Sequence, residues 1–267
     1  MTVELERVGH VALLTLNRPE RLNALNEAMW RGIDDALDKL EAELPRALVI
    51  TGAGEKAFCA GMDINPDNPQ IAALVTAVQQ GDRGPCEALL RGLRKTVDRL
   101  VDLPIPVIAA INGLAYGGAA EIATRCDLRV VDPKAMIAFS EVRLGLMPDL
   151  GGGPALARLL GPGKAADLIL TARKVGAEEA LALGLANRIS EAGGVKEAGI
   201  ALGQAIADNG PRAVRSALKV IRCAADMPLD QALEFELNQA ADLIASGECQ
   251  HGITAVMSKQ KPNFPAI

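Results

Sequence analysis

Hydrophobic residues in the first half of the chain occur in short continuous runs that alternate with apolar positions at helical spacing. The runs typical of buried strands cover residues 11–16, 47–51, 107–111, 128–131 and 136–139. Between the first two runs, apolar residues recur at helical spacing and Asn26 is positioned as an N-cap. Strands that are apolar throughout are buried on both faces, so the pattern predicts an α/β fold with a sheet covered by helices.

The second half of the chain is predicted to be mainly helical. From residue 152 onward strand signals almost disappear, and helices are predicted over residues 163–172, 177–183, 196–208, 211–225 and 229–246. Residues 64–85 contain several Pro and Gly and are predicted to form a mobile lid or loop with one short helix. We therefore expect an α/β core over residues 1–200 and a C-terminal helical region over residues 201–267.

An uncharged stretch at residues 103–120 has the length of a membrane span but not its composition. Two prolines and three glycines interrupt it, which favours a buried strand, a glycine turn and a helix start over a lipid-facing helix. The first four residues, Met-Thr-Val-Glu, carry an acid where a signal peptide carries basic residues. We expect a cytoplasmic protein with no membrane partner.

Charge and composition exclude several classes of function. The net charge of −5 and the six aromatic residues argue against a nucleic-acid partner, which needs a basic face or stacking platforms. Five cysteines without a Cys-x-x-Cys pair predict free thiols, with neither a disulfide framework nor a metal site. The chain has only two histidines, so acid–base chemistry is assigned to carboxylates.

Three clusters combine glycines or small residues with carboxylates. They are residues 57–64 (AFCAGMDI), 112–121 (NGLAYGGAAE) and 139–153 (FSEVRLGLMPDLGGG). In the second cluster a helix that begins near Gly118 would leave its first N–H groups unpaired and would carry Glu121 at the same end. Each cluster has a simpler explanation as an ordinary turn or helix start, and no dinucleotide or Walker-type phosphate motif is present.

Taken together and in this order, the clusters resemble the enoyl-CoA hydratase/isomerase (crotonase) superfamily. The resemblance also includes residues 17–25 (NRPERLNAL), 141–146 (EVRLGL), 180–186 (ALALGLA) and 261–264 (KPNF), so it extends over nearly the whole chain. It implies a crotonase-like spiral of strand-strand-helix units followed by C-terminal trimerisation helices. It also implies a homotrimer or a dimer of trimers, with the C-terminal region serving oligomerisation and covering the site.

The resemblance implies an acyl-CoA thioester as substrate, no prosthetic group, and coenzyme A only as part of that substrate. The main-chain N–H groups of Met62 and Gly118 would form an oxyanion hole for the thioester oxygen. In hydratases of the family two glutamates hold a water over the 2,3-double bond. By motif position, Glu121 would activate the water and Glu141 would deliver the proton to C2, and the two carboxyls should titrate as a coupled pair with one pKa raised.

The family's coenzyme A contacts transfer to this sequence at seven positions. They are Arg21, Ala24, Ala60, Asp63, Ile64, Lys261 and Phe264. Arg21 would lie near the nucleotide phosphates, and the next four would line the path of the adenine and pantetheine, largely through their backbone. The last two, from this chain or a symmetry mate, would close over the adenosine.

Two departures from the hydratase pattern keep other activities open. Asp149 occupies a position at which many hydratases have glycine. Dienoyl-CoA isomerases have an acid at this position and use it together with the residue that matches Glu141. The segment between residues 63 and 112 also looks longer than in a typical hydratase, as it does in those isomerases, although they usually carry Asp where this chain has Glu121. Arg143, close to Glu141 in sequence, is expected to hold that acid ionised. The alternatives are therefore a hydratase, an enoyl-CoA or dienoyl-CoA isomerase that uses Glu141 and Asp149, and a family member that binds acyl-CoA or RNA without turnover. The intact pair of glutamates favours the hydratase.

Overall fold

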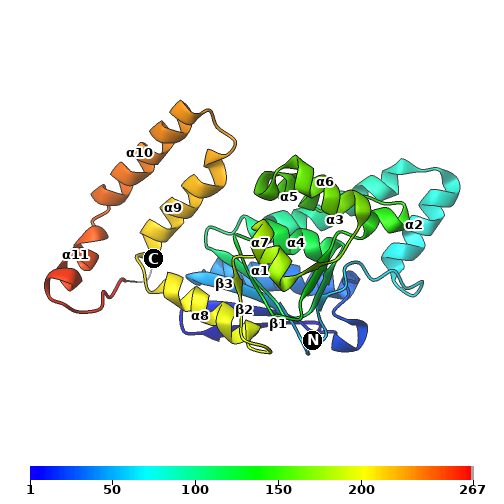
Figure 1. The fold of residues 1–267 in the computed structure, drawn as a ribbon, viewed down its shortest axis with the longest axis horizontal. Coiled ribbons are helices and arrows are strands. Elements are labelled where there is room, and N and C mark those ends of the chain that lie inside the picture. Colours follow the sequence, from blue (N-terminus) through cyan, green and yellow to red (C-terminus); the bar gives the residue numbers. More distant parts are fainter. Residues whose placement is uncertain (266–267) are drawn as a thin grey trace.

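The computed structural model describes residues 1–265 and contains two sheets (Figure 1). The six-stranded sheet has the order β1 (Val3–Val8), β2 (Val11–Leu16), β3 (Ala47–Gly52), β5 (Val107–Ile111), β7 (Leu128–Val131) and β10 (Arg188–Ile189). The four-stranded sheet has the order β4 (Ala57–Cys59), β6 (Leu114–Tyr116), β8 (Met136–Ala138) and β9 (Val175–Gly176). The predicted strands and the α/β fold class are confirmed.

Helices cover both faces of the larger sheet. On one face lie α1 (Glu27–Ala42), α3 (Arg83–Val101) and α4 (Gly118–Arg125), and on the other lies α8 (Val195–Ala207). Alternate residues of a strand therefore enter different cores: Leu48 and Ile50 face the first, whereas Val49 faces α8. This double burial explains why β2, β3 and β5 are apolar at nearly every position.

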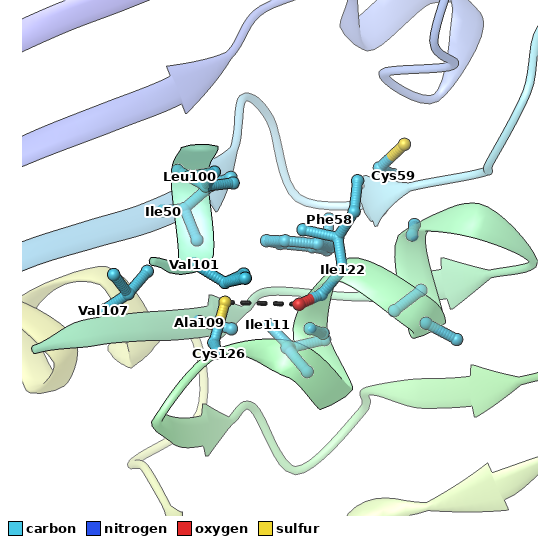
Figure 2. Packing of buried hydrophobic residues seen from close by; sticks show 14 of the residues in the cluster. Ile50, Phe58, Cys59, Leu100, Val101, Val107, Ala109, Ile111, Ile122 and Cys126 are labelled. Carbon is cyan, nitrogen blue, oxygen red and sulfur yellow. Dashed lines mark hydrogen bonds between the residues drawn. The ribbon is translucent and has the colours of Figure 1, made fainter. Parts of the chain in front are cut away.

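The predicted N-cap of the first helix is confirmed, since the Asn26 side chain accepts a hydrogen bond from the Met29 N–H at 3.0 Å. Helix α4 begins at Gly118, as expected. Figure 2 shows how side chains of β3, β4, β5, α3 and α4 meet in one core, with the Cys126 thiol donating to the Ile122 carbonyl oxygen at 3.3 Å. This core holds the N-terminal end of α4 against the smaller sheet.

The predicted lid is mainly helical rather than a loop with one short helix. Helix α2 (Pro69–Gln80) has twelve residues, and α3 already begins at Arg83. Pro69 occupies the first turn of α2 and Pro85 the first turn of α3, where a missing N–H breaks no helical hydrogen bond. The prolines therefore mark helix starts and not a loop.

The remaining helices lie in the second half of the chain. They are α5 (Gly152–Leu160), α6 (Pro162–Thr171), α7 (Ala177–Leu183), α9 (Pro211–Ala224), α10 (Leu229–Ala245) and α11 (Cys249–Met257), with 3₁₀ turns η1 (Pro19–Arg21) and η2 (Glu141–Leu144). The expected boundary at residue 200 falls within α8, which packs on the sheet through Gly199 and Gly203. Helices α10 and α11 stand apart from the α/β body (Figure 1), whereas α9 is joined to it by Arg222, which donates to Asp127 at 2.6 Å and to the Leu103 carbonyl oxygen at 2.8 Å. Among residues 1–265, no helix is long and apolar enough to cross a membrane.

Candidate active site

Three neighbouring strands of the smaller sheet bring the three sequence clusters together. Strands β4, β6 and β8 run parallel to one another, so their carboxyl ends lie at the same edge. The segment 60–62 follows β4, the glycine pair 117–118 follows β6, and Glu141 follows β8. In α/β structures the carboxyl edge of parallel strands is where binding sites form.

Two main-chain N–H groups at this edge have no acceptor among the residues that the structure describes. Leu25 pairs with the residues on either side of Met62: its N–H donates to the Gly61 carbonyl oxygen at 2.8 Å, and its own carbonyl oxygen accepts from the Asp63 N–H at 2.9 Å. The Met62 N–H therefore points away from Leu25. Within residues 1–265, neither this N–H nor that of Gly118, the first residue of α4, has a hydrogen-bond acceptor.

Glycines allow these backbones to approach each other closely. Gly61 has φ +88°, and a Cβ there would lie 2.6 Å from the Tyr116 carbonyl oxygen and 3.5 Å from the Gly118 nitrogen. Gly117 has φ +55°, and a Cβ there would lie 3.6 Å from Glu141 Oε1. The Glu141 carboxyl group therefore lies directly beside the glycine pair that carries one of the free N–H groups.

Glu121 is fully buried in the first turn of α4 and is held by three main-chain donors. Its Oε2 accepts from the N–H groups of Leu150 at 2.9 Å and Gly152 at 2.8 Å, and its Oε1 accepts from the N–H of Asp149 at 3.2 Å. Gly152 is required for this contact, because a Cβ there would lie 2.4 Å from Glu121 Cγ. The loop between η2 and α5 thus wraps around a single carboxylate.

Glu141 has the opposite environment. Both of its carboxyl oxygens are buried, and neither has a hydrogen-bond partner among residues 1–265. Burial raises the pKa of Glu141, and the negative charge of Asp149 raises it further. Burial also raises the pKa of Glu121, to about 7, with the charge of Glu141 acting in the same direction and the three amide donors acting against it.

Asp149 is the third carboxylate of the site. The residue is exposed overall, but partial burial of its carboxyl group and the charge of Glu121 raise its pKa to about 6. The expectation for Arg143 is wrong: this side chain is exposed, makes no ion pair within residues 1–265, and leaves the pKa of Glu141 raised rather than lowered. None of the three acids forms an ion pair within residues 1–265.

Known proteins resemble this chain over nearly its whole length. The enoyl-CoA hydratase/isomerase family matches residues 6–266. A short-chain-enoyl-CoA hydratase of Clostridium acetobutylicum is 35% identical over 262 residues, which cover 97% of this chain and 95% of that protein. The crystal structure of an enoyl-CoA hydratase from Bacillus anthracis superposes with a TM-score of 0.89 at 32% identity, covering 99% of both chains.

This chain belongs to the enoyl-CoA hydratase/isomerase family. A crotonyl-CoA hydratase of Syntrophomonas wolfei, 33% identical over 97% of this chain and 96% of its own, is a further relative. The match confirms both the predicted resemblance and the predicted spiral fold.

Five of the seven positions transferred from the family's coenzyme A site lie together in the structure. The Ala60 N–H donates to the Leu22 carbonyl oxygen at 3.0 Å, which continues the ladder between Leu25 and Met62. This ladder aligns the segment that contains Ala24 with Ala60, Asp63 and the exposed Ile64. Arg21 is exposed at the end of η1, just before the same segment.

The other two positions lie elsewhere in this chain. Lys261 forms an ion pair with Asp208 at 2.6 Å, and the Phe264 carbonyl oxygen accepts from Arg46 at 2.7 Å. The Phe264 ring packs edge-on against His251 of α11. These contacts hold the C-terminal segment beside α8, α9 and α11, so within one chain neither residue joins the other five.

Arg18 is a residue of the family motif to which the sequence analysis assigned no role. Its guanidinium donates to the Ala24 carbonyl oxygen at 2.6 Å and to Asp63 Oδ2 at 3.0 Å, and both charged side chains are almost fully buried. Burial opposes the charge of Asp63, but hydrogen bonds from Asn65 and Arg18 hold its pKa below the ordinary value. A buried ion pair thus braces the segment that presents the Met62 N–H. In the sequence, the Arg18–Asp63 ion pair is indicated by an Arg-Pro turn together with an aspartate directly after Ala-Gly-Met.

Proposed function

We propose that this chain is an enoyl-CoA hydratase that adds water reversibly to a trans-2-enoyl-CoA and produces a 3-hydroxyacyl-CoA. The observation that carries the proposal is the unequal hydrogen bonding of the two glutamates beside two free main-chain N–H groups. Glu121 accepts three amide hydrogen bonds, whereas Glu141 accepts none within residues 1–265. Water addition needs one base and one acid at one place, and this asymmetry supplies both.

Glu121 is suited to be the base. A carboxylate has about four acceptor positions, and the three amides occupy three of them, which leaves one on Oε1 for a water molecule. The amides also stabilise the ionised form, so the shared proton resides on Glu141. The buried, unpaired carboxyl group of Glu141 is then the acid that protonates C2.

The reaction follows from these assignments. The water oxygen forms a bond to C3 while Glu121 takes its proton, and the electron pair of the double bond moves onto the thioester oxygen. The N–H groups of Met62 and Gly118 stabilise the resulting enolate, and such preorganised donors are each worth about 10²–10³ in rate. Glu141 then transfers its proton to C2. Afterwards Glu121 carries a proton and Glu141 is ionised, and proton exchange restores the starting state.

The proposal is tested by incubating the protein with crotonyl-CoA and following the absorbance of the conjugated thioester. We expect the signal to fall to an equilibrium value, and the product to be 3-hydroxybutyryl-CoA by mass spectrometry. An unchanged signal with crotonyl-CoA and with longer trans-2-enoyl-CoA thioesters would exclude the hydratase.

A second candidate, a dienoyl-CoA isomerase, is favoured by one specific observation. Asp149 is a third acid at the site, and burial together with the charge of Glu121 raises its pKa to about 6, which suits proton transfer. Asp149→Gly should then abolish the conversion of a 3,5-dienoyl-CoA while leaving hydration of crotonyl-CoA in place. If the variant loses both activities equally, Asp149 has a structural role only.

We also propose that the substrate's coenzyme A moiety binds along Arg21, Ala24, Ala60, Asp63 and Ile64, and that no prosthetic group takes part. Assembly as a homotrimer or a dimer of trimers is supported by large exposed apolar residues on α9 to α11: Ile221, Leu229, Leu233, Leu237, Ile244, Ile253, Val256 and Met257. Such an assembly would allow Lys261 and Phe264 of a neighbouring subunit to cover the site. The mass measured by light scattering should be three or six times that of one chain.

A further inference from the structure

Arg125 connects the active-site loop to two helices behind the site. It is the last residue of α4, one helical turn beyond Glu121, and only 14% of its side chain is exposed. Its Nη1 donates to the Leu150 carbonyl oxygen at 2.8 Å, and its Nη2 donates to Asp98 Oδ1 of α3 at 2.6 Å. The guanidinium thus joins α3, α4 and the loop that follows Asp149.

Side chains of α4 therefore bind both backbone polar groups of Leu150. Its N–H donates to Glu121, and its carbonyl oxygen accepts from Arg125. Gly151 has φ +93° and packs so closely on the guanidinium that a Cβ there would lie 3.2 Å from Arg125 Nη1. The Leu150 side chain also reaches Gly118, where a Cβ would lie 3.0 Å from Leu150 Cδ1.

We propose that Arg125, oriented by Asp98, is a positioning residue that fixes the loop 149–152 so that its amides hold Glu121. This inference rests on the proposed hydratase function for its kinetic consequences but not for its structural ones. Arg125 touches no reacting atom. It acts through Leu150, whose position determines the orientation of the peptide groups on which Glu121 depends.

The decisive variant is Arg125→Met, which keeps an apolar stem and removes both hydrogen bonds. We expect kcat to fall about 10- to 100-fold, because small displacements of reacting groups have effects of this size. KM should change by less than about threefold, since no substrate contact is lost. The acidic limb of the pH–rate profile should move to higher pH, because weakened amide bonds no longer oppose the rise in the pKa of Glu121.

A readout independent of activity is amide hydrogen exchange of residues 149–153. In Arg125→Met these amides should exchange about tenfold faster or more, as expected for a locally opened loop. Asp98→Asn should change every readout in the same direction by less, and it serves as the second variant if Arg125→Met does not fold. Arg125→Lys should restore part of the protection through a single donor.

Arg94→Met is the matched control. Arg94 approaches the same Asp98, at 3.9 Å, but it is an exposed residue of α3 without a contact to the loop, so its removal should leave exchange and pH profile unchanged. The proposal is overturned if Arg125→Met keeps wild-type exchange and the wild-type pH profile, even if its thermal stability falls. If the wild-type protein hydrates no enoyl-CoA, the hydratase proposal fails, and the exchange experiment alone decides the role of Arg125.

Discussion

Glu121 and Glu141 are neighbours in the site, but the elements that carry them give their carboxyl groups different hydrogen-bond environments. Glu121 sits in the first turn of a helix under a wrapped loop, and three amides point at its carboxylate. Glu141 opens a 3₁₀ turn after a strand, and its buried oxygens have no partner within the described chain. A hydrogen bond to a charged group is worth about 1.5–3 kcal/mol, so three of them decide which neighbouring acid keeps the proton.

With Glu121 as the proposed base and Glu141 as the proposed acid, the backbone and not the side-chain type distinguishes the two roles. Burial raises the pKa of both glutamates, and the three amide donors of the loop oppose this rise at Glu121. Since one pKa unit corresponds to about 1.4 kcal/mol, loss of a single donor is enough to change the distribution of the shared proton. Substitutions in the loop 149–152 should therefore change the pKa of Glu121 more than that of Glu141.

The largest effect is expected when the base itself is removed. Glu121→Gln keeps the size of the side chain but cannot take a proton from water, so kcat for crotonyl-CoA hydration should fall by about 10²–10⁴-fold. Affinity for acyl-CoA, measured by calorimetry, should stay nearly the same. Glu178→Gln, which changes an exposed glutamate in the first turn of α7, is the matched control. Hydration at the wild-type rate by Glu121→Gln would refute the assigned role.

A smaller loss should follow when the loop is displaced but both acids remain. A methyl group at Gly152 would lie 2.4 Å from Glu121 Cγ and 2.8 Å from its Cα, so Gly152→Ala must separate the loop from the carboxylate. We expect about a 10²-fold fall in kcat, measured on protein whose folding is verified by thermal melting. Gly153→Ala is the control, since its Cβ would meet only Pro148 at 3.9 Å. Equal losses in both variants would show that general helix damage is responsible.

Only part of the strand edge where the acids meet could be predicted from the sequence. The hydrophobic pattern predicts the strand before Glu141 and the helix start at Gly118, but it does not indicate β4 and β6, which have only three residues each. The identity of the partners could not be predicted in the same way. Glu121 is bound by amides of residues 149, 150 and 152, which lie 28 to 31 positions away, and no local pattern indicates where a loop folds back.

The predictions for Arg143 and for residues 64–85 are wrong for similar reasons. Arg143 is two residues from Glu141, but in a 3₁₀ turn neighbouring side chains point in different directions, and the guanidinium faces solvent. Pro69 and Pro85 predicted a loop because proline breaks helices in their interior, whereas here both lie in first turns. Contacts of the C-terminal segment with Arg46 and Asp208 depend on chain folding that periodicity does not reveal.

The smallest effect is expected when the negative charge of Asp149 beside Glu141 is removed. The negative charge of Asp149 raises the pKa of Glu141, so Asp149→Asn should lower it. Because Glu141 must be protonated to act, activity would then be lost at lower pH, and the alkaline limb of kcat/KM should move down by a fraction of a pH unit. The acidic limb, which reports ionisation of Glu121, should move less. The pair titrates as a unit, so the measured values belong to both glutamates.

Arg143→Gln is the matched control for this experiment, because it changes one exposed charge in the same turn without contact to either glutamate. Its pH–rate profile should coincide with that of the wild type, since an exposed charge is screened by solvent and salt. A shift of the alkaline limb to higher pH in Arg143→Gln would mean that this guanidinium favours the ionised form of Glu141 in the wild type. No shift in Asp149→Asn would mean that burial alone raises the pKa of Glu141, and the difference between the two glutamates would then rest entirely on the amide donors of the loop.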